Sequence, residues 1–317
     1  MITMEGVAVK LLVINNLVSG YREGAIYDFI RMLIADGDEV VIRSTDGTSD
    51  IPGFLTDAHE YDLVVASGGD GTIATVAYEL ANTKIPILAF PAGTANLLHM
   101  NLLLPNETHA LAKLAREGNA LDFDLGEILL ENGDRLGFSI MAGAGYDADI
   151  MKNAAPHKRL LGPMAYFSAA IANPTPKFSR FTLEIDGETF ESEGVGVLII
   201  NFSKIQFDIS VIHENLPRDG MLEVVVLKAR DALGLVPALF AGILDRGGEF
   251  PNRTEALEIH RGKQIRIDAD PPLHIQYDGE ASEFTTPFSV GVVDRSARFL
   301  VSEECLKLYG DHESDEN

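Results

Sequence analysis

Short apolar runs alternate with amphipathic segments along the chain as far as Asp124. Four runs are mostly apolar and rich in β-branched residues, as strands buried on both faces are: Val7–Ile14, Val40–Ile42, Leu63–Ala66 and Ile85–Phe90. Three further segments carry apolar residues at helical spacing: Tyr21–Ala35, Thr72–Leu80 and Glu107–Glu117. Repeated strand–helix units of this kind predict a doubly wound α/β domain built around a parallel sheet.

The period of the pattern changes after Asp124. Apolar and polar residues alternate in Phe181–Asp186 and again in Gln264–Asp268, which is typical of antiparallel strands covered on one face. Asp186-Gly187 supplies a hairpin turn, and Leu160–Ala172 is a helical interruption. The pattern therefore predicts a second domain that is an antiparallel β-sandwich.

The change of period sets the expected domain limits. We expect an α/β domain over residues 1–125 and a β-sandwich over 126–299. Residues 300–310, which include a predicted helix over Glu303–Tyr309, are a candidate to complete the first domain. Residues 311–317 form an acidic tail.

Composition excludes several classes of protein. The chain has 48 acidic and 25 basic residues among 317, and its net charge of −23 disfavours nucleic acid as a partner. A single cysteine, Cys305, excludes an internal disulfide framework and fits a reducing cytoplasm. The longest apolar stretch, Leu233–Leu244, contains Pro237 and is shorter than the roughly 20 residues needed to span a bilayer.

Two glycine-containing loops follow predicted strands. Gly68–Thr72 comes after Leu63–Ala66 and directly precedes a helical segment, while Pro91–Asn96 follows the next apolar run. Glycines at a strand-to-helix junction allow the backbone to approach a phosphate, and the helix N-terminus offers unpaired N–H groups. An isolated cluster of this kind is more often a turn whose aspartate caps the helix. Two such loops at the carboxyl ends of neighbouring strands instead predict one shared site for an anionic ligand.

In this order and spacing, Gly68–Thr72 and Pro91–Asn96 resemble the nucleotide-binding signatures of the diacylglycerol kinase catalytic family, which includes bacterial lipid kinases. NAD kinases and phosphofructokinases have a similar first loop, whereas the second is more typical of lipid kinases. Other segments also resemble the family: Asn16–Gly20, Asp124–Gly126, Gly143–Ala148 and Asp219–Leu222. The resemblance implies an NAD kinase/phosphofructokinase-like first domain for the nucleotide and a sandwich domain for the lipid.

The implied activity is transfer of the γ-phosphate of ATP to a lipid hydroxyl, of the diacylglycerol or sphingoid type, with Mg²⁺. The residues implied to bind or border the nucleotide are Asn16, Ser19, Gly20, Ser44, Thr45, Gly68, Gly69, Gly71, Thr72, Gly93, Thr94 and Asn96. Asp70 would hold the magnesium ion of the nucleotide. A second, structural magnesium is implied at the Asp219 carboxylate and the main-chain carbonyls of Leu216 and Met221.

Asp278-Gly279-Glu280 resembles the late catalytic motif of the family. Two carboxylates flank one glycine, so one could accept the proton of an attacking hydroxyl while the other supports it. By itself the motif is equally an ordinary Asp-Gly turn. We expect Glu280 to be the base and Asp278 the supporting residue, a preference taken from the family.

The chain departs from the family at two positions. Leu17 stands where proline is common, and Leu97 replaces a common aspartate, which removes one carboxylate from the site. Two alternatives therefore stay open: another small-molecule kinase such as an NAD kinase, or a nucleotide-binding regulator without catalysis.

Lipid as a substrate implies contact with a membrane surface. Lys152, His157, Lys158 and Arg159 precede the apolar segment Leu160–Ala172, a combination that can rest on a bilayer. A basic turn leading into a core helix explains it equally well. We expect a cytoplasmic protein with peripheral contact at the inner face of the membrane; the sequence leaves the lipid and the oligomeric state open.

Overall fold

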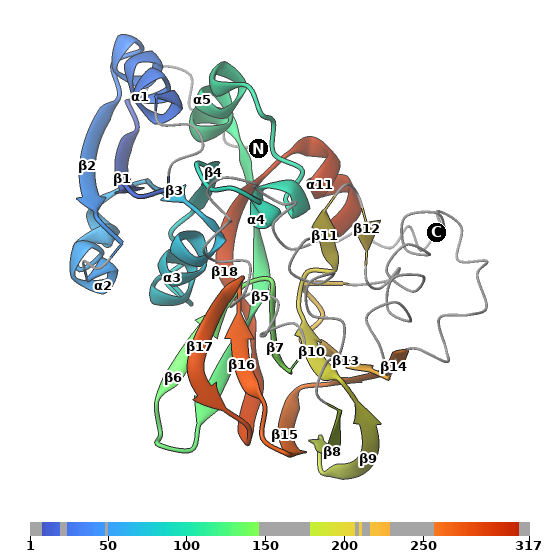
Figure 1. Cartoon of the computed structure of the whole chain (residues 1–317). Helices are drawn as coiled ribbons and strands as arrows, with labels where there is room; N and C mark the ends of the chain where they lie inside the picture. The colour runs from blue at the N-terminus through green and yellow to red at the C-terminus, as the bar shows by residue number, and fades with distance from the viewer. Residues whose placement is uncertain are drawn as a thin grey trace, which may run out of the picture. The chain divides into compact units, whose positions relative to one another are not determined.

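The computed structural model describes residues 8–19, 24–47, 50–145, 178–206, 209–210, 216–228 and 257–310. Residue contacts divide the chain into two compact units. The N-terminal unit comprises Met1–Phe123 and Arg295–Asn317, and the C-terminal unit comprises Asp124–Asp294. Each unit is described by itself below (Figure 1).

The N-terminal unit contains a parallel sheet. Its strands are β1 (Lys10–Asn16), β2 (Glu39–Thr45), β3 (Leu63–Gly68), β4 (Ile87–Pro91) and the end of β18 (Phe288–Val301), in the order β2-β1-β3-β4-β18. The pairs β1–β2, β1–β3, β3–β4 and β4–β18 are all parallel. The strand–helix pattern thus correctly predicted a parallel doubly wound sheet.

Helices connect and cover these strands. They are α1 (Ala25–Ala35), α2 (Ile51–Phe54), α3 (Asp70–Glu79), α4 (Leu97–Asn101), α5 (Thr108–Glu117) and α11 (Glu303–Tyr309), with a 3₁₀ turn over Ala58–Glu60. Helix α1 buries Ile26, Phe29, Ile30 and Leu33 on one face, and the ring of Phe29 lies 5.3 Å from that of Phe90 on β4. Helices α1 and α5 pack side by side, as Figure 1 shows.

The C-terminal unit is built from antiparallel strands. One sheet has the order β14-β13-β10-β7-β16-β17. Its strands are β7 (Met141–Gly145), β10 (Gly196–Ile200), β13 (Leu222–Leu227), β14 (Leu257–Gly262), β16 (His274–Tyr277) and β17 (Glu280–Thr285). The other strands are the part of β5 (Asn119–Leu130) from Asp124 on, β6 (Arg135–Phe138), β8 (Ser179–Ile185), β9 (Glu188–Gly194), β15 (Gln264–Asp270) and the first part of β18. Short β11 (Lys204–Gln206) pairs with β12 (Ile209–Ser210).

A single hydrophobic cluster joins the two layers of the C-terminal unit. Phe181 and Leu183 of β8 and Ile265 and Ile267 of β15 belong to it, as does Ile275 of β16. These are the alternating apolar positions that predicted a sandwich, and Asp186-Gly187 forms the predicted β8–β9 turn with both φ angles positive. The sandwich prediction is confirmed.

Several elements were not predicted. Helices α2 and α4 are four and five residues long, too short to show a helical period. Strand β18 extends over 14 residues, from the C-terminal unit into the N-terminal unit, and the pattern gave no sign of it. The predicted helix Leu160–Ala172 lies outside the described residues.

Candidate active site

The carboxyl ends of four parallel strands lie at one edge of the N-terminal sheet. In the register of the sheet, Asn16 of β1 is opposite Thr45 of β2, and Gly68 of β3 is opposite Pro91 of β4. Every predicted phosphate loop therefore leaves a strand at the same edge, which is where open α/β sheets bind ligands.

The loop after β1 is tied to the first glycine loop by two side chains. Asn16 donates an Nδ2–H to Thr72 Oγ1 at 2.9 Å and accepts from the Val18 N–H at 3.1 Å. The hydroxyl oxygen of Ser19 accepts from the Gly69 N–H at 3.2 Å. Asn16 and Ser19 thus position the loop residues around Gly69, and Gly20 lies outside the described residues.

The loop after β2 borders the same edge. Thr45 is buried; its hydroxyl accepts from the Gly47 N–H at 3.1 Å and its carbonyl accepts from the Leu17 N–H at 2.9 Å. The neighbouring Ser44 is exposed. Leu17, which replaces a common proline, uses its N–H in this contact, and a proline would have no N–H to donate.

The two glycine loops touch each other. A Cβ placed on Gly93 would stand 2.5 Å from the Cα of Gly69, so no side chain fits at that position. Asn96, which has a positive φ of 53°, accepts from the Gly93 N–H at 2.8 Å and so fixes the second loop. The prediction that both loops reach one place is confirmed.

Asp70 links the first glycine loop to helix α4. Its Oδ1 accepts from the Leu98 N–H at 3.0 Å, and the residue is the first of α3, whose N-cap is Gly69. Asp70, Gly71 and Thr94 are all half-buried, so solvent reaches this part of the loops. A carboxylate beside main-chain N–H groups suits an anion accompanied by a hard cation such as Mg²⁺.

The other predicted carboxylates lie in the turn between β16 and β17. Asp278 is 6% exposed, has a positive φ of 43°, and accepts from the N–H groups of Ser139, Ile140 and Met141 at 2.6, 2.8 and 3.1 Å. Three main-chain donors to one carboxylate fix the turn. Glu280, by contrast, is exposed.

Tyr277 is a neighbour of this turn that the sequence analysis missed. Burial raises the pKa of its phenol, and the negative charges of Glu280 and Asp278 raise it further. The phenol is therefore neutral and can donate a hydrogen bond at neutral pH. Its position immediately before Asp278 was the only signal available in the sequence.

Two of the three groups predicted to hold a structural magnesium ion, the Asp219 carboxylate and the Leu216 carbonyl, have other partners. The Asp219 carboxylate forms an ion pair with Arg261 and accepts from the Met221 N–H at 3.0 Å. The carbonyl of Leu216 accepts from the Arg218 N–H at 2.8 Å. Because a guanidinium already balances the Asp219 charge, these residues do not fit a magnesium ion as they stand.

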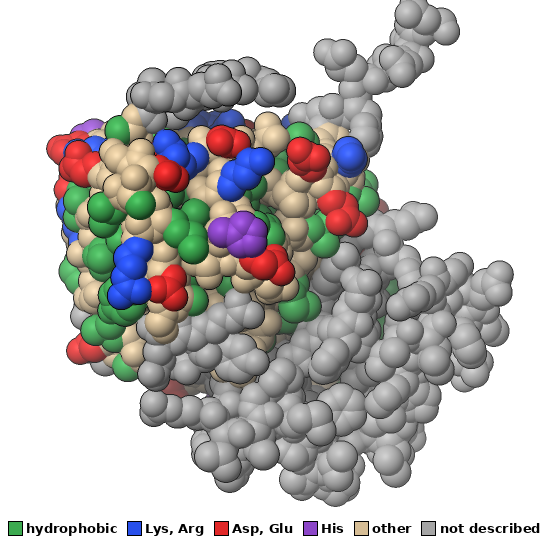
Figure 2. Space-filling model, turned by 90° about the horizontal axis from the view of Figure 1, so that it is seen from above, with side chains coloured by type: hydrophobic (Ala, Val, Ile, Leu, Met, Phe, Trp, Pro, Cys, Tyr) green, Lys and Arg blue, Asp and Glu red, His purple; other side chains and the backbone are tan. Residues whose placement is uncertain are grey.

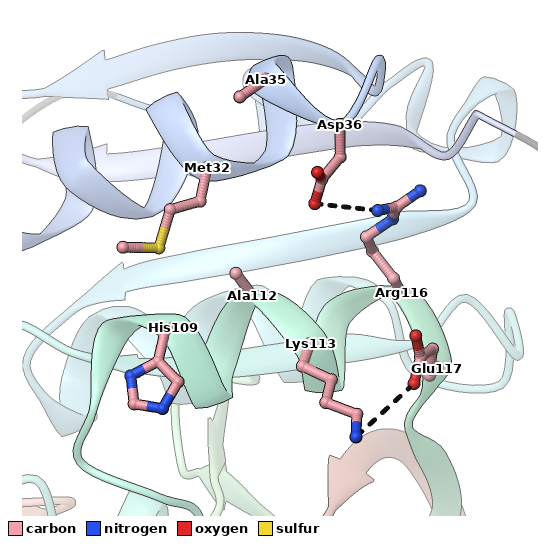
Figure 3. Close-up of a pocket in the computed structure, with 8 residues that line it drawn as sticks. All are labelled: Met32, Ala35, Asp36, His109, Ala112, Lys113, Arg116 and Glu117. Atoms are coloured by element: carbon pink, nitrogen blue, oxygen red, sulfur yellow. Dashed lines mark ion pairs between the residues drawn. The ribbon is translucent and has the colours of Figure 1, made fainter.

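A hollow of about 390 Å³ lies between α1 and α5 in the N-terminal unit (Figure 3). Its cations are already paired: Arg116 with Asp36 at 2.9 Å, and Lys113 with Glu117 at 4.0 Å. Asp36 follows α1 and precedes β2, so the hollow lies toward the amino ends of the strands, away from the glycine loops. We assign it no ligand.

Among the described residues on the face shown in Figure 2, basic side chains are interspersed with acidic ones and form no large patch. The basic cluster predicted to dock on a membrane, with Lys152, His157, Lys158 and Arg159, lies outside the described residues. Among the described helices, none is long and apolar enough to cross a bilayer.

Comparison with known proteins gives matches over most of the chain. Residues 10–128 match the family model of the diacylglycerol kinase catalytic domain, and residues 140–301 match that of the YegS C-terminal NAD kinase beta sandwich-like domain. A probable lipid kinase, YegS-like, from Pectobacterium atrosepticum is 30% identical over 75% of this chain and 81% of its own length.

Two further matches concern length and fold. An uncharacterized protein from Synechocystis is 29% identical over 83% of this chain, which spans 61% of that relative's length. A crystal structure described as a diacylglycerol kinase from Bacillus anthracis superimposes with a TM-score of 0.74 at 23% identity, covering 93% of this chain and 98% of that one.

Proposed function

This chain belongs to the diacylglycerol kinase catalytic domain family, and we propose that it is a lipid kinase that transfers the γ-phosphate of ATP to a lipid hydroxyl. One observation supports the proposal above the others: the contact between Gly69 and Gly93. It brings two backbone-lined loops and the N-terminus of α3 together at the carboxyl edge of a parallel sheet.

The triphosphate is held mainly by main-chain N–H groups. The candidate donors are the N–H groups of Asp70, Gly71 and Thr72 in the first turn of α3 and that of Thr94, and the glycines let the phosphate oxygens approach the backbone. The N–H groups of Gly69 and Gly93 are instead bonded to Ser19 and Asn96. Asn16, Ser19 and Asn96 keep these segments in place through the hydrogen bonds described above. Gly68 and Thr45 shape the same edge, and Ser44 borders the nucleotide.

Magnesium accompanies the nucleotide. When bound, the ion neutralises charge on the phosphate oxygens. Asp70 is the carboxylate that fits it, because it stands at the first turn of α3 next to the loop amides. Its hydrogen bond from the Leu98 N–H fixes its orientation. Asp70 therefore binds the ion without the second carboxylate that is common in the family at the position of Leu97.

Glu280 accepts the proton of the attacking lipid hydroxyl. Its exposure leaves the carboxylate accessible, whereas the Asp278 carboxylate is already bonded to three main-chain N–H groups. Asp278 is therefore a positioning residue: it holds the turn that presents Glu280. This division of roles supports the sequence-based preference for Glu280 as the base.

A phosphorylation assay with γ-labelled ATP tests the proposal. The acceptors are diacylglycerol, monoacylglycerol, sphingosine and ceramide in detergent micelles, with NAD as a non-lipid acceptor. We expect label in at least one lipid and none in NAD. Label in NAD alone would overturn the proposal in favour of an NAD kinase, and ATP binding without transfer to any acceptor would overturn it in favour of a regulator.

Matched variants test whether the proposed catalytic carboxylates are needed for the transfer. Asp70→Asn and Glu280→Gln are expected to abolish most of the transfer. Glu283→Gln, which changes an exposed carboxylate on the same strand as Glu280, should leave it unchanged. Equal activity in Glu280→Gln and Glu283→Gln would exclude Glu280 as the base.

A further inference from the structure

The six-stranded sheet of the C-terminal unit has two buried faces. Successive residues of a strand point to opposite faces. Ala144, Val197, Ile199, Val224 and Ile275 lie in the core cluster of the sandwich. The residues between them point to the opposite face, here called the outer face, and are also buried: Met141, Gly143, Leu198, Ile200, Val225 and Gln276.

Gln276 is the polar residue within this apolar set. Its side chain is 0% exposed, and within the described part of the chain neither its Oε1 nor its Nε2 has a hydrogen-bond partner. His274, two residues earlier on the same face of β16, has a buried Nδ1 that also lacks one. A row of unsatisfied polar groups thus leads along β16 toward Asp278 and the Glu280 turn.

Gly143 lets the amide lie directly against the neighbouring strand. It is the residue paired with Gln276 across β7 and β16, and a Cβ placed there would stand 2.7 Å from the Val197 carbonyl and 3.4 Å from Gln276 Nε2. No side chain therefore fits between the amide and Leu198 on the next strand.

A buried amide without partners destabilises a protein, so its presence here points to a group that binds to it. The amide offers a donor and an acceptor together. A carboxylate would satisfy only the donor and an ammonium only the acceptor, whereas a hydroxyl or a secondary amide satisfies both. On the same face, Leu198 is in register beyond Gly143, Val225 is on the strand after it, and Ile200 is two residues along from Leu198; together they form an apolar surface that suits a hydrocarbon chain.

We propose that the Gln276 amide binds the head of the lipid acceptor and selects lipids that carry a second hydroxyl or an amide beside the reacting hydroxyl. The inference rests on the proposed function and identifies the acceptor more closely. Monoacylglycerol and ceramide meet the requirement, whereas diacylglycerol has a single hydroxyl, the one that reacts.

The test compares kcat/KM for 1-monooleoylglycerol and for dioleoylglycerol in wild type and in Gln276→Met, which keeps the length of the side chain and removes the amide. We expect wild type to prefer the monoacylglycerol, and the preference to fall about tenfold or more in the variant. Activity with dioleoylglycerol should fall less than activity with the monoacylglycerol, because dioleoylglycerol has no second hydroxyl to pair with both groups of the amide. The melting temperature without lipid should be unchanged or higher, because the amide has no partner there.

Gln264→Met is the matched control, since Gln264 is exposed and lies on β15 of the other layer. It should leave the preference as in wild type. An unchanged preference in Gln276→Met, or an equal loss with both acceptors together with a lower melting temperature, would overturn the inference and leave the kinase proposal intact.

A second measurement does not depend on turnover or on the variant. Added to wild type without ATP, 1-monooleoylglycerol should raise the melting temperature more than dioleoylglycerol does. Equal shifts would overturn the inference. If wild type phosphorylates no lipid in the panel, the proposed function fails, and these shifts still decide whether the amide selects polar heads.

Discussion

The glycine loops of the N-terminal unit and the β16–β17 turn of the C-terminal unit both contain an aspartate next to a glycine, but the two carboxylates have different surroundings. Asp70 is half-buried at the first turn of a helix, beside main-chain N–H groups of the loops. Asp278 is almost fully buried and its carboxylate accepts from three main-chain N–H groups. The comparison teaches that main-chain N–H groups can be left to bind a ligand, as proposed for the glycine loops, or can be bonded by a carboxylate of the protein, as they are by Asp278.

The largest expected effect on stability comes from removing the Asp278 carboxylate, which accepts hydrogen bonds from the backbone. Asp278→Ala leaves the N–H groups of Ser139, Ile140 and Met141 without their acceptor, which should lower the free energy of unfolding by about 4 kcal/mol. Urea denaturation followed by circular dichroism measures the loss. Asp278→Asn retains one acceptor oxygen and should lose less; equal stability of Asp278→Ala and wild type would show that the carboxylate does not hold the turn.

Replacing Glu280, in the same turn, should lower the activity and leave the stability unchanged. Glu280→Gln is expected to lower kcat about 100-fold or more, because the proton of the lipid hydroxyl loses its acceptor. The residue is exposed, so the urea midpoint should stay as in wild type. If Glu280→Gln lost stability as well as activity, Glu280 would have a structural role like that of Asp278, and its assignment as the base would fail.

The contact between the glycine loops can be broken by one methyl group. Gly93→Ala places a Cβ 2.5 Å from the Cα of Gly69 and 3.1 Å from Asn96 Oδ1, so the loops must separate. We expect the KM for ATP to rise about tenfold, since phosphate-binding groups are displaced. Gly24→Ala, at a glycine with open space around it, is the control and should leave the KM unchanged. An unchanged KM for ATP in Gly93→Ala would show that the two glycine loops do not bind the nucleotide.

What the sequence could predict depended on how local each feature is. The parallel sheet and both glycine loops follow from short patterns, because a strand, its loop and the next helix are consecutive in the chain. The partners of Asp278 could not be predicted, because Ser139 lies 139 positions earlier in the sequence. The same holds for Arg261, which meets Asp219 across 42 positions, and for the unsatisfied amide of Gln276.

Glu258 sharpens the comparison, because its carboxylate is hydrogen-bonded by side chains and not by main-chain N–H groups. Burial opposes the ionisation of Glu258, but hydrogen bonds from His260, Lys228 and Ser192 outweigh it and lower its pKa to about 2. A lowered pKa stabilises the fold above the ordinary value near 4.5, and that contribution is lost as the pH falls toward 2. Glu258→Gln should therefore cost about 1 to 2 kcal/mol at pH 7, and less as the pH falls below 4.5.

Urea unfolding of Glu258→Gln and wild type at several pH values checks this prediction. Glu283→Gln, at an exposed carboxylate on β17, should differ from wild type by no more than about 0.5 kcal/mol at every pH. A difference between Glu258→Gln and wild type that stays constant from pH 7 to pH 2 would show that the ionised carboxylate contributes nothing.

The smallest expected effect is that of adding the metal chelator EDTA to the nucleotide-free protein. Arg261 pairs with Asp219 and its Nε lies 3.5 Å from the buried Glu223 carboxylate, so a side-chain cation already faces both carboxylates. EDTA should therefore shift the melting temperature of nucleotide-free wild type by no more than about 1 °C. Arg261→Gln removes the guanidinium, and its melting temperature should become sensitive to added Mg²⁺, because the Asp219 carboxylate then loses its ion-pair partner. A fall of several degrees in wild type on adding EDTA would instead show that Asp219 binds a metal despite its ion pair with Arg261.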